Sequence, residues 1–499
     1  MDFLIVLSNV LNPSSLFMIA LGVLIGLVFG VIPGLNTPIA MALILPFTFT
    51  LGTIFIICII MGIYMGGVSG GLVTAVLFKI PGTAASVATT FDGYPMAMKG
   101  EGLQALCIGT FGSFFGGIFS SFALLLFAPL LSKIAIQFGP WEYFGATTLA
   151  LSLICVLSNG KLIKGFISVG LGLFITTVGM SPIDGIATRF TFGNYNLENG
   201  FSLIAIVIGV FAMPEIINTT AKISEKIKPV EVPKKLFYTL SLKEIKKYFG
   251  TFLRSSILGT VFGILPGLGG GPAGLVAYAQ EKKLSKTPEQ FGQGIGYGVA
   301  ASESANNATT GGALIPTLAL SIPGDTTTAI ILGAFALQGI VTGPLLSINQ
   351  PVLFRTIIFI VFIANIFMFI LQGLSIRYLA KIIQAPRFYL IPIISFFCLT
   401  GIMCINNNVF DLYYSIGFIL LGYILDKNGY PIAPLILGVV LGSVIETNLR
   451  RSFSYYGNFM GCLSRPSVGT IFLFIAILVP LVSIASVIIR FFKNRKAAI

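Results

Sequence analysis

The most polar stretch between apolar segments of this 499-residue chain runs from Ala301 to Gly312 and reads A-S-E-S-A-N-N-A-T-T-G-G. In a helix, Glu303, Asn306 and Asn307 share one face, because they stand at positions i, i+3 and i+4. Acids and amides are costly inside a membrane, so this group predicts a binding or ion-transfer site. The alternative is a helix that starts at the membrane surface with Ser302 as its cap.

Two short motifs with a Pro-Gly break each occur twice. V-F-G-V-I-P-G-L at Val28–Leu35 returns 233 residues later as V-F-G-I-L-P-G-L at Val261–Leu268, and I-P-G at Ile80–Gly82 returns 242 residues later at Ile322–Gly324. Proline removes a helical hydrogen bond and glycine permits a sharp turn. Broken backbone inside a membrane needs protein or a polar cavity around it. The repetition predicts re-entrant tips or discontinuous helices around a site; the alternative is that the glycines serve close helix packing alone.

The residues at and after these breaks are small, hydroxylic or amide-bearing. Freed backbone N–H groups and helix N-termini suit an anion, neighbouring hydroxyls and amides can bind carboxylate oxygens, and carbonyls can bind sodium. Helix capping by Asn and Thr is the alternative. The candidate substrate-binding residues are Pro33, Gly34, Asn36, Thr37, Pro81, Gly82, Thr83, Ser86, Gly267, Gly269, Asn306, Asn307, Pro323, Gly324 and Thr326.

The composition predicts the elements that position these residues. The chain is 56% hydrophobic and 9% charged, whereas soluble domains carry about 25% charged residues. Apolar runs such as Leu106–Leu131 and Phe354–Leu374 reach the ~20 residues that span a bilayer. We predict an all-α polytopic membrane protein with about 12 transmembrane segments, including re-entrant or broken helices, and two internal repeats.

Basic residues suggest how these repeats lie in the membrane. The net charge of +13 is concentrated in loops, which indicates the positive-inside rule and no nucleic acid partner. We expect a first membrane repeat at 1–214, a basic cytoplasmic linker at 215–250, a second repeat at 251–445, and a C-terminal helix with a basic tail at 446–499. Residues 1–78 contain no Lys or Arg, which favours an outside N-terminus, whereas Arg490, Lys493, Arg495 and Lys496 place the C-terminus in the cytoplasm. Together with the basic linker, this arrangement favours inverted repeats.

Several chemistries are excluded or disfavoured. The chain has no histidine, which removes His-based proton relays, His-ligated zinc sites and Ser–His triads. No metal site is expected beyond a candidate sodium ion, and no catalytic residue or other cofactor is expected. Gly269–Gly274 matches G-x-G-x-x-G, but no βαβ unit surrounds it, and no P-loop for ATP exists. The chain is therefore not expected to be an enzyme, although a membrane-embedded enzyme and an ion channel remain as alternatives.

The motifs resemble those of one family, the large membrane subunit of the tripartite tricarboxylate transporters. The resemblance covers essentially the whole chain, with one departure: serine often follows the second I-P-G in the family, where this chain has Asp325. The matching stretches are G-x-x-P-G-L at Gly30–Leu35, Y-M-G-G-V-S-G-G at Tyr64–Gly71, I-P-G-T at Ile80–Thr83, D-G-Y-P-M-A at Asp92–Ala97, S-E-S-A-N-N-A at Ser302–Ala308, I-P-G at Ile322–Gly324, P-L-I-L-G-V-V-L-G at Pro434–Gly442 and E-x-x-L-R-R at Glu446–Arg451.

The resemblance implies a secondary transporter that imports small di- or tricarboxylates by alternating access, driven by a sodium or proton gradient. It also implies a bacterial inner-membrane location and two protein partners, a small four-helix membrane subunit and an extracytoplasmic solute-binding protein. Membrane lipid is the remaining partner.

An anionic substrate would be repelled by acids in the same site unless a cation lay between them. We therefore assign Asp92, Glu303 and Asp325 to the coupling ion. Lys79 is the basic residue beside a Pro-Gly break, so we expect neutral donors to provide most of the recognition. We also expect the tips at Pro33 and Pro266 to meet near the membrane midplane, with those at Pro81 and Pro323 close by.

Overall fold

A computed structural model of the chain describes residues 2–32, 35–48, 50–156, 161–183, 185, 187–214, 217, 239–267, 269–383, 392, 395–396, 398–403 and 408–497. Its regular structure is helical, as predicted, apart from a small antiparallel hairpin of β1 (Gly179–Met180) and β2 (Thr188–Arg189). Pro33, Gly34 and most of the predicted linker lie outside the described residues.

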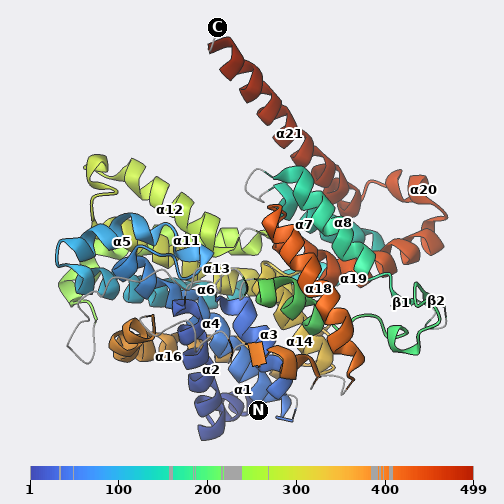
Figure 1. Cartoon of the computed structure of the whole chain (residues 1–499), viewed down its shortest axis with the longest axis horizontal. Helices are drawn as coiled ribbons and strands as arrows, with labels where there is room; N and C mark the ends of the chain where they lie inside the picture. The colour runs from blue at the N-terminus through green and yellow to red at the C-terminus, as the bar shows by residue number, and fades with distance from the viewer. Residues whose placement is uncertain are drawn as a thin grey trace.

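The first half of the chain contains long membrane helices and short helical turns (Figure 1). They are α1 (Asp2–Leu11), α2 (Pro13–Val31), α3 (Thr37–Thr48), α4 (Thr53–Phe78), η1 (Ala84–Ser86), α5 (Thr89–Met98), α6 (Gly102–Ala135), α7 (Pro140–Val156), α8 (Leu162–Ile175), η2 (Tyr195–Leu197), α9 (Leu203–Val207) and the π-helical turn η3 (Ile208–Ala212).

The second half and the C-terminal part follow a similar alternation of long and short helices. They are α11 (Leu242–Ile264), α12 (Gly270–Leu284), η4 (Pro288–Gln290), α13 (Gly296–Leu320), α14 (Thr326–Leu337), α15 (Leu346–Asn349), α16 (Pro351–Ile383), α18 (Phe410–Lys427), α19 (Ile432–Tyr456), α20 (Phe459–Leu463) and α21 (Val468–Ala497).

Six helices of the described part are long and apolar enough to cross a membrane. They are α2, α4, α6, α16, α19 and the first part of α21; α3, α8 and α14 are shorter apolar helices. The chain is therefore a multi-pass membrane protein, as predicted. The finer figure of about 12 segments stays a prediction.

Two helix pairs form the centre of the molecule, and glycines allow both to pack closely. A Cβ atom on Gly26 of α2 would lie 2.6 Å from the backbone nitrogen of Gly67 on α4. In the second half, a Cβ atom on Gly259 of α11 would lie 2.7 Å from the Cα atom of Ala305 on α13. Small residues of this kind bring membrane helices into backbone contact, so close helix packing is one function of these glycines.

The Pro-Gly breaks have the same local geometry in the two halves. The residue after α2, Ile32, and the residue after α11, Leu265, are both extended, with φ/ψ of −78°/114° and −81°/117°. The residues that end α4 and α13, Lys79 and Ser321, both have a left-handed φ of 57°. These pairs are separated by the same 233 and 242 residues as the sequence motifs.

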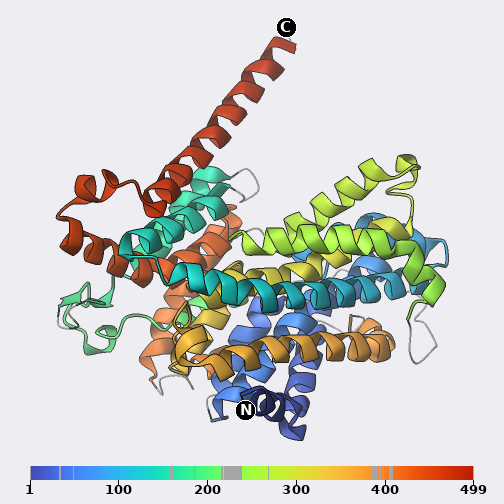
Figure 2. The same cartoon turned by 180° about the vertical axis from the view of Figure 1, so that it is seen from behind.

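The two longest helices each pack against the other half of the chain. Helix α6 of the first half contacts α11 and α13, whereas α16 of the second half contacts α2 and α4 (Figure 2). A separate group packs α7 against α21 and α8 against α19, and the C-terminal part of α21 projects away from the body. This exchange locks the central helix pairs together.

Candidate functional site

A cavity of about 290 Å³ lies where the short helices that follow the breaks meet. Residues from both halves line it. Those that the sequence predicted are Asn36, Thr37, Thr83, Gly267, Gly269, Asn306, Asp325 and Thr326.

Three helices from the two halves begin at the wall of this cavity. The first residues of α3, α12 and α14 are Thr37, Gly270 and Thr326, and all three line it. Helix N-termini carry unpaired N–H groups and a partial positive charge, so their convergence favours an anion. No Lys or Arg stands among the described lining residues.

The three N-termini differ in how they are capped. The Asn36 side chain accepts a hydrogen bond from the backbone N–H of Ile39 in α3 (3.1 Å). The Asp325 carboxylate accepts one from the backbone N–H of Thr328 in α14 (2.7 Å). Gly269 before α12 has a left-handed φ of 59° and no side chain to cap with. The N–H groups of α12 are therefore the donors least occupied by side chains.

Asp325 joins the two halves at the cavity. One carboxylate oxygen accepts hydrogen bonds from the backbone N–H and the hydroxyl of Thr328, at 2.7 and 2.9 Å. The other accepts the hydroxyl of Tyr64, a buried residue of α4, at 2.8 Å. The alternative of capping by Asn is realised at α3 by Asn36, whereas α14 is capped by the carboxylate of Asp325, which also lines the cavity.

The predicted face of Glu303, Asn306 and Asn307 exists on α13, but its three members lie in different surroundings. Asn306 lines the cavity and donates to the carbonyl of Val68 (3.4 Å). Asn307 lies outside the lining and donates to the Ser69 hydroxyl (2.6 Å). The alternative of a helix start capped by Ser302 is wrong, because this residue is buried inside α13.

The other two predicted coupling acids lie outside the cavity lining. Glu303 is fully buried and accepts the hydroxyls of Thr89 (2.5 Å) and Ser113 (3.0 Å). Asp92 is fully buried as well, and one of its oxygens accepts three backbone N–H groups at 2.8–3.1 Å, those of Gly292, Gly294 and Ile295. Asp92 therefore anchors the loop before α13 to the first half.

Several of the predicted residues lie outside the cavity lining, at or next to the Pro-Gly breaks. In the second half, the N–H of Gly267 donates to the carbonyl of Gly324 at 2.7 Å, so those two breaks touch. Between the halves, a Cβ atom on Gly271 of α12 would lie 3.1 Å from the carbonyl oxygen of Ala84 in η1. The predicted residues outside the lining are Pro81, Gly82, Ser86, Asn307, Pro323 and Gly324, besides the two acids.

The sequence reading missed Tyr64, which contacts Asp325 across the halves. A signal for it existed, because Tyr64 stands 242 residues before Asn306, the offset that relates the two I-P-G breaks. Other lining residues that were missed, such as Phe211 and Ile154, carry no comparable pattern. They reach the cavity from outside the repeated motifs.

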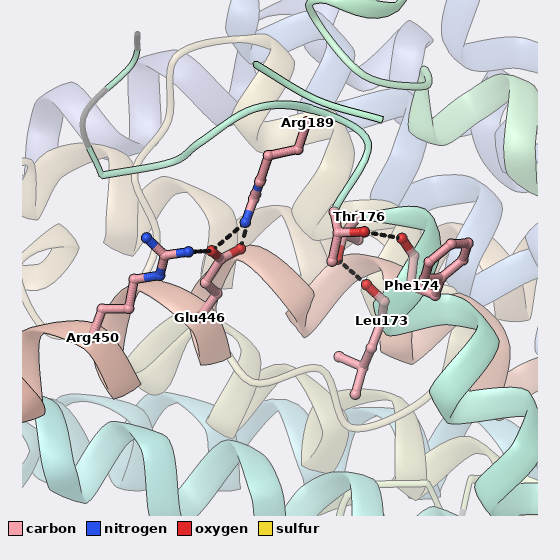
Figure 3. Close-up of polar contacts among 7 residues, drawn as sticks. Leu173, Phe174, Thr176, Arg189, Glu446 and Arg450 are labelled. Atoms are coloured by element: carbon pink, nitrogen blue, oxygen red, sulfur yellow. Dashed lines mark hydrogen bonds and ion pairs between the residues drawn. The ribbon is translucent and has the colours of Figure 1, made fainter. Parts of the chain in front are cut away.

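The E-x-x-L-R-R motif lies elsewhere and has a structural function (Figure 3). Glu446 on α19 accepts two hydrogen bonds from Arg189 of β2, at 2.6 and 3.1 Å, and pairs with Arg450 at 2.9 Å. The cluster holds the hairpin against α19. A larger cavity of about 740 Å³ opens near it, but its lining is mainly apolar and includes none of the predicted site residues.

Comparisons with known proteins agree with the motifs. A profile described as the tripartite tricarboxylate transporter TctA family matches residues 16–437. The chain is 39% identical over 442 residues to an uncharacterised 52.8 kDa protein in the TAR-I ttuC' 3' region of Agrobacterium vitis, which covers 89% of this chain and 88% of the relative. An uncharacterised protein in the TAR-II ttuC' 3' region of that organism is 44% identical over 194 residues, 39% of this chain and 80% of its own. No solved structure matches.

Proposed function

The chain belongs to the tripartite tricarboxylate transporter TctA family, and from this premise we propose that it is the large permease subunit of a secondary transporter that imports small di- or tricarboxylates. Family membership itself makes it the multi-pass membrane component of a tricarboxylate transporter and not an enzyme. The membrane-embedded enzyme and the ion channel are therefore not retained.

One observation carries the proposal for the substrate site: three helix N-termini from both halves converge on one cavity, and no Lys or Arg stands among the lining residues that the structure describes. Each exposed N-terminus favours an anion by about 0.3–1 kcal/mol, and by up to about 2 kcal/mol where it is partly buried. Converging ends can hold a carboxylate without the desolvation cost of a buried Lys or Arg. The N–H groups at the start of α12 are the first candidates, because no side chain caps them.

We further propose that the halves are inverted repeats that operate by alternating access. The matched breaks at Ile32 and Leu265, and at Lys79 and Ser321, support a repeat. The long helices α6 and α16 also correspond to each other, because each packs against the central helix pair of the other half. The boundaries at 1–214, 215–250, 251–445 and 446–499 remain part of this proposal.

A cation is proposed as the driving ion, because acids close to an anion site need one to offset their repulsion. Asp325 is the foremost of the three assigned acids, since it lines the cavity. Glu303 is fully buried one helical turn from Asn306. Asp92 is the weakest candidate of the three, because its carboxylate already accepts hydrogen bonds from the backbone of the loop at Gly292–Ile295.

The tripartite family description implies two further components. We propose that these are the small four-helix membrane subunit and an extracytoplasmic solute-binding protein that delivers the carboxylate. The proposed location is the bacterial inner membrane, with the N-terminus outside and the basic C-terminus in the cytoplasm.

Uptake into proteoliposomes that contain all three components tests the proposal. Labelled di- and tricarboxylates are offered with and without a sodium gradient, and with and without a proton gradient. We expect uptake that requires all three proteins and one of the two gradients. Accumulation without either gradient, or no uptake of any carboxylate by a folded complex, would contradict it.

A further inference from the structure

Four buried amide side chains outside or beside the cavity share an unusual property. Asn306, Asn307, Asn365 and Gln372 each donate a hydrogen bond through nitrogen, while each oxygen is buried without a partner. All four are fully buried. Buried polar atoms normally have a hydrogen-bond partner. A group of unpaired acceptors therefore indicates a bound cation or a bound hydrogen-bond donor.

Two of these oxygens belong to side chains that meet at one residue of α4. The Asn307 amide of α13 donates to the hydroxyl of Ser69 at 2.6 Å, and the Gln372 amide of α16 donates to its backbone carbonyl at 3.1 Å. Helices α13 and α16 therefore place two amide groups against Ser69 of α4, and each of these amides carries a buried, unpaired oxygen beside the nitrogen that donates there. All three residues are fully buried.

The chemistry of this group fits a small monovalent cation. Carbonyl and hydroxyl oxygens replace the hydration shell of alkali ions in membrane proteins. A divalent ion fits poorly, because neutral ligands leave two buried charges without compensation. An anion is excluded because the unpaired atoms are acceptors. A buried water that donates to the two amide oxygens is the competing occupant.

We propose that Ser69, Asn307 and Gln372 hold a sodium ion directly behind the wall of the substrate cavity. The preceding residue on each of two helices faces the cavity: Val68 and Asn306 line it and are joined by a hydrogen bond. A cation here is therefore one residue away from the anion site along both α4 and α13. The inference deepens the proposed function, on which its coupling role rests; the binding site itself does not need that role.

Sodium binding is measured on the purified full-length protein in detergent, through its thermal unfolding midpoint. The single tryptophan, Trp141, provides a fluorescence signal. Sodium chloride is replaced stepwise by choline or potassium chloride at constant ionic strength. A ligand that binds only the folded state raises the midpoint in a saturable way. We expect this for sodium, whereas a buried water predicts no difference among the salts, which would overturn the proposal.

Two variants at the site act in opposite directions. Gln372→Met removes the amide oxygen, together with the nitrogen that donates to the Ser69 carbonyl, at similar volume. It should raise the half-saturating sodium concentration about tenfold or more. Gln372→Glu adds a charged oxygen, and it should lower that concentration. If both variants keep the wild-type sodium response, the site is wrong. Because Gln372→Glu is expected to bind sodium more tightly, the proposal stays testable even if Gln372→Met folds poorly.

Asn365→Leu is the matched control. Asn365 lies on the same helix, is equally buried and also has an unpaired oxygen, but its amide contacts Met65 and Ser121 instead of Ser69. The sodium response of Asn365→Leu should equal that of the wild type. Loss of this response would contradict the proposed location of the sodium site at Ser69, Asn307 and Gln372. Uptake is measured separately: failed carboxylate uptake with intact sodium binding contradicts the proposed function and leaves this site standing.

Discussion

Asp325 is both a helix cap and a wall residue of the cavity, so its charge can be separated from its hydrogen bonds. In Asp325→Asn the amide oxygen still caps α14, because Asn and Asp are equivalent caps. The new NH₂ group can donate to the Tyr64 hydroxyl. We expect the cation concentration for half-maximal uptake to rise about tenfold, or about 1.4 kcal/mol, with a smaller change in substrate KM. Uptake kinetics at varied cation and substrate concentrations measure both.

Glu303→Gln is the companion variant, because Glu303 is fully buried but does not line the cavity. If Asp325→Asn and Glu303→Gln each leave the cation dependence untouched, both acids are structural and the coupling assignment is wrong. A loss of folding in either variant shows in the thermal unfolding midpoint, which is measured alongside.

Asp92 is expected to behave as an anchor. Asp92→Ala removes the acceptor for three backbone N–H groups at Gly292–Ile295. Unpaired buried donors cost about 1–3 kcal/mol, so the unfolding midpoint should fall and less folded protein should be recovered. The remaining protein should keep the wild-type cation concentration for half-maximal uptake. A changed cation dependence at an unchanged midpoint would instead support the coupling assignment of Asp92.

Glycines at the helix contacts provide the test at the scale of elements. In Gly259→Ala the new Cβ atom would lie 2.7 Å from the Ala305 Cα atom, so α11 and α13 must move apart. Overpacking of this kind costs about 1–3 kcal/mol, and the unfolding midpoint should fall. Gly170→Ala in α8 is the control, because nothing lies within 4 Å of its Cβ position. An equal midpoint in the two variants would contradict the packing account.

The sequence predicted these elements where a physical signal was local. Proline followed by glycine identified the breaks, whereas the Asp325 cap of α14 was not predicted, because Asp325 was assigned to the coupling ion. The exchange of α6 and α16 between the halves was not predicted, because side-chain patterns do not specify which apolar helix faces another. Phe211 and Ile154 were missed at the cavity for the same reason.

At the scale of the whole molecule, inverted repeats require that corresponding helices enter from opposite sides. Single cysteines are placed at Leu11, at the end of α1, and at Lys243, at the start of α11, in a variant without native cysteines. An impermeant thiol reagent added outside intact cells should label Leu11→Cys and not Lys243→Cys. Labelling of both from the cytoplasmic side would contradict the inverted arrangement.

The measurement that tests the central claim most directly is substrate protection of a cysteine in the cavity. Thr326→Cys stands at the start of α14 in the wall, and Thr342→Cys lies in the larger apolar cavity as a matched control. Both are reacted with a small thiol reagent in protein without native cysteines that retains uptake. A transported carboxylate should slow the reaction at Thr326→Cys and leave Thr342→Cys unchanged. Equal rates with and without substrate at Thr326→Cys, or protection at Thr342→Cys alone, would contradict the account.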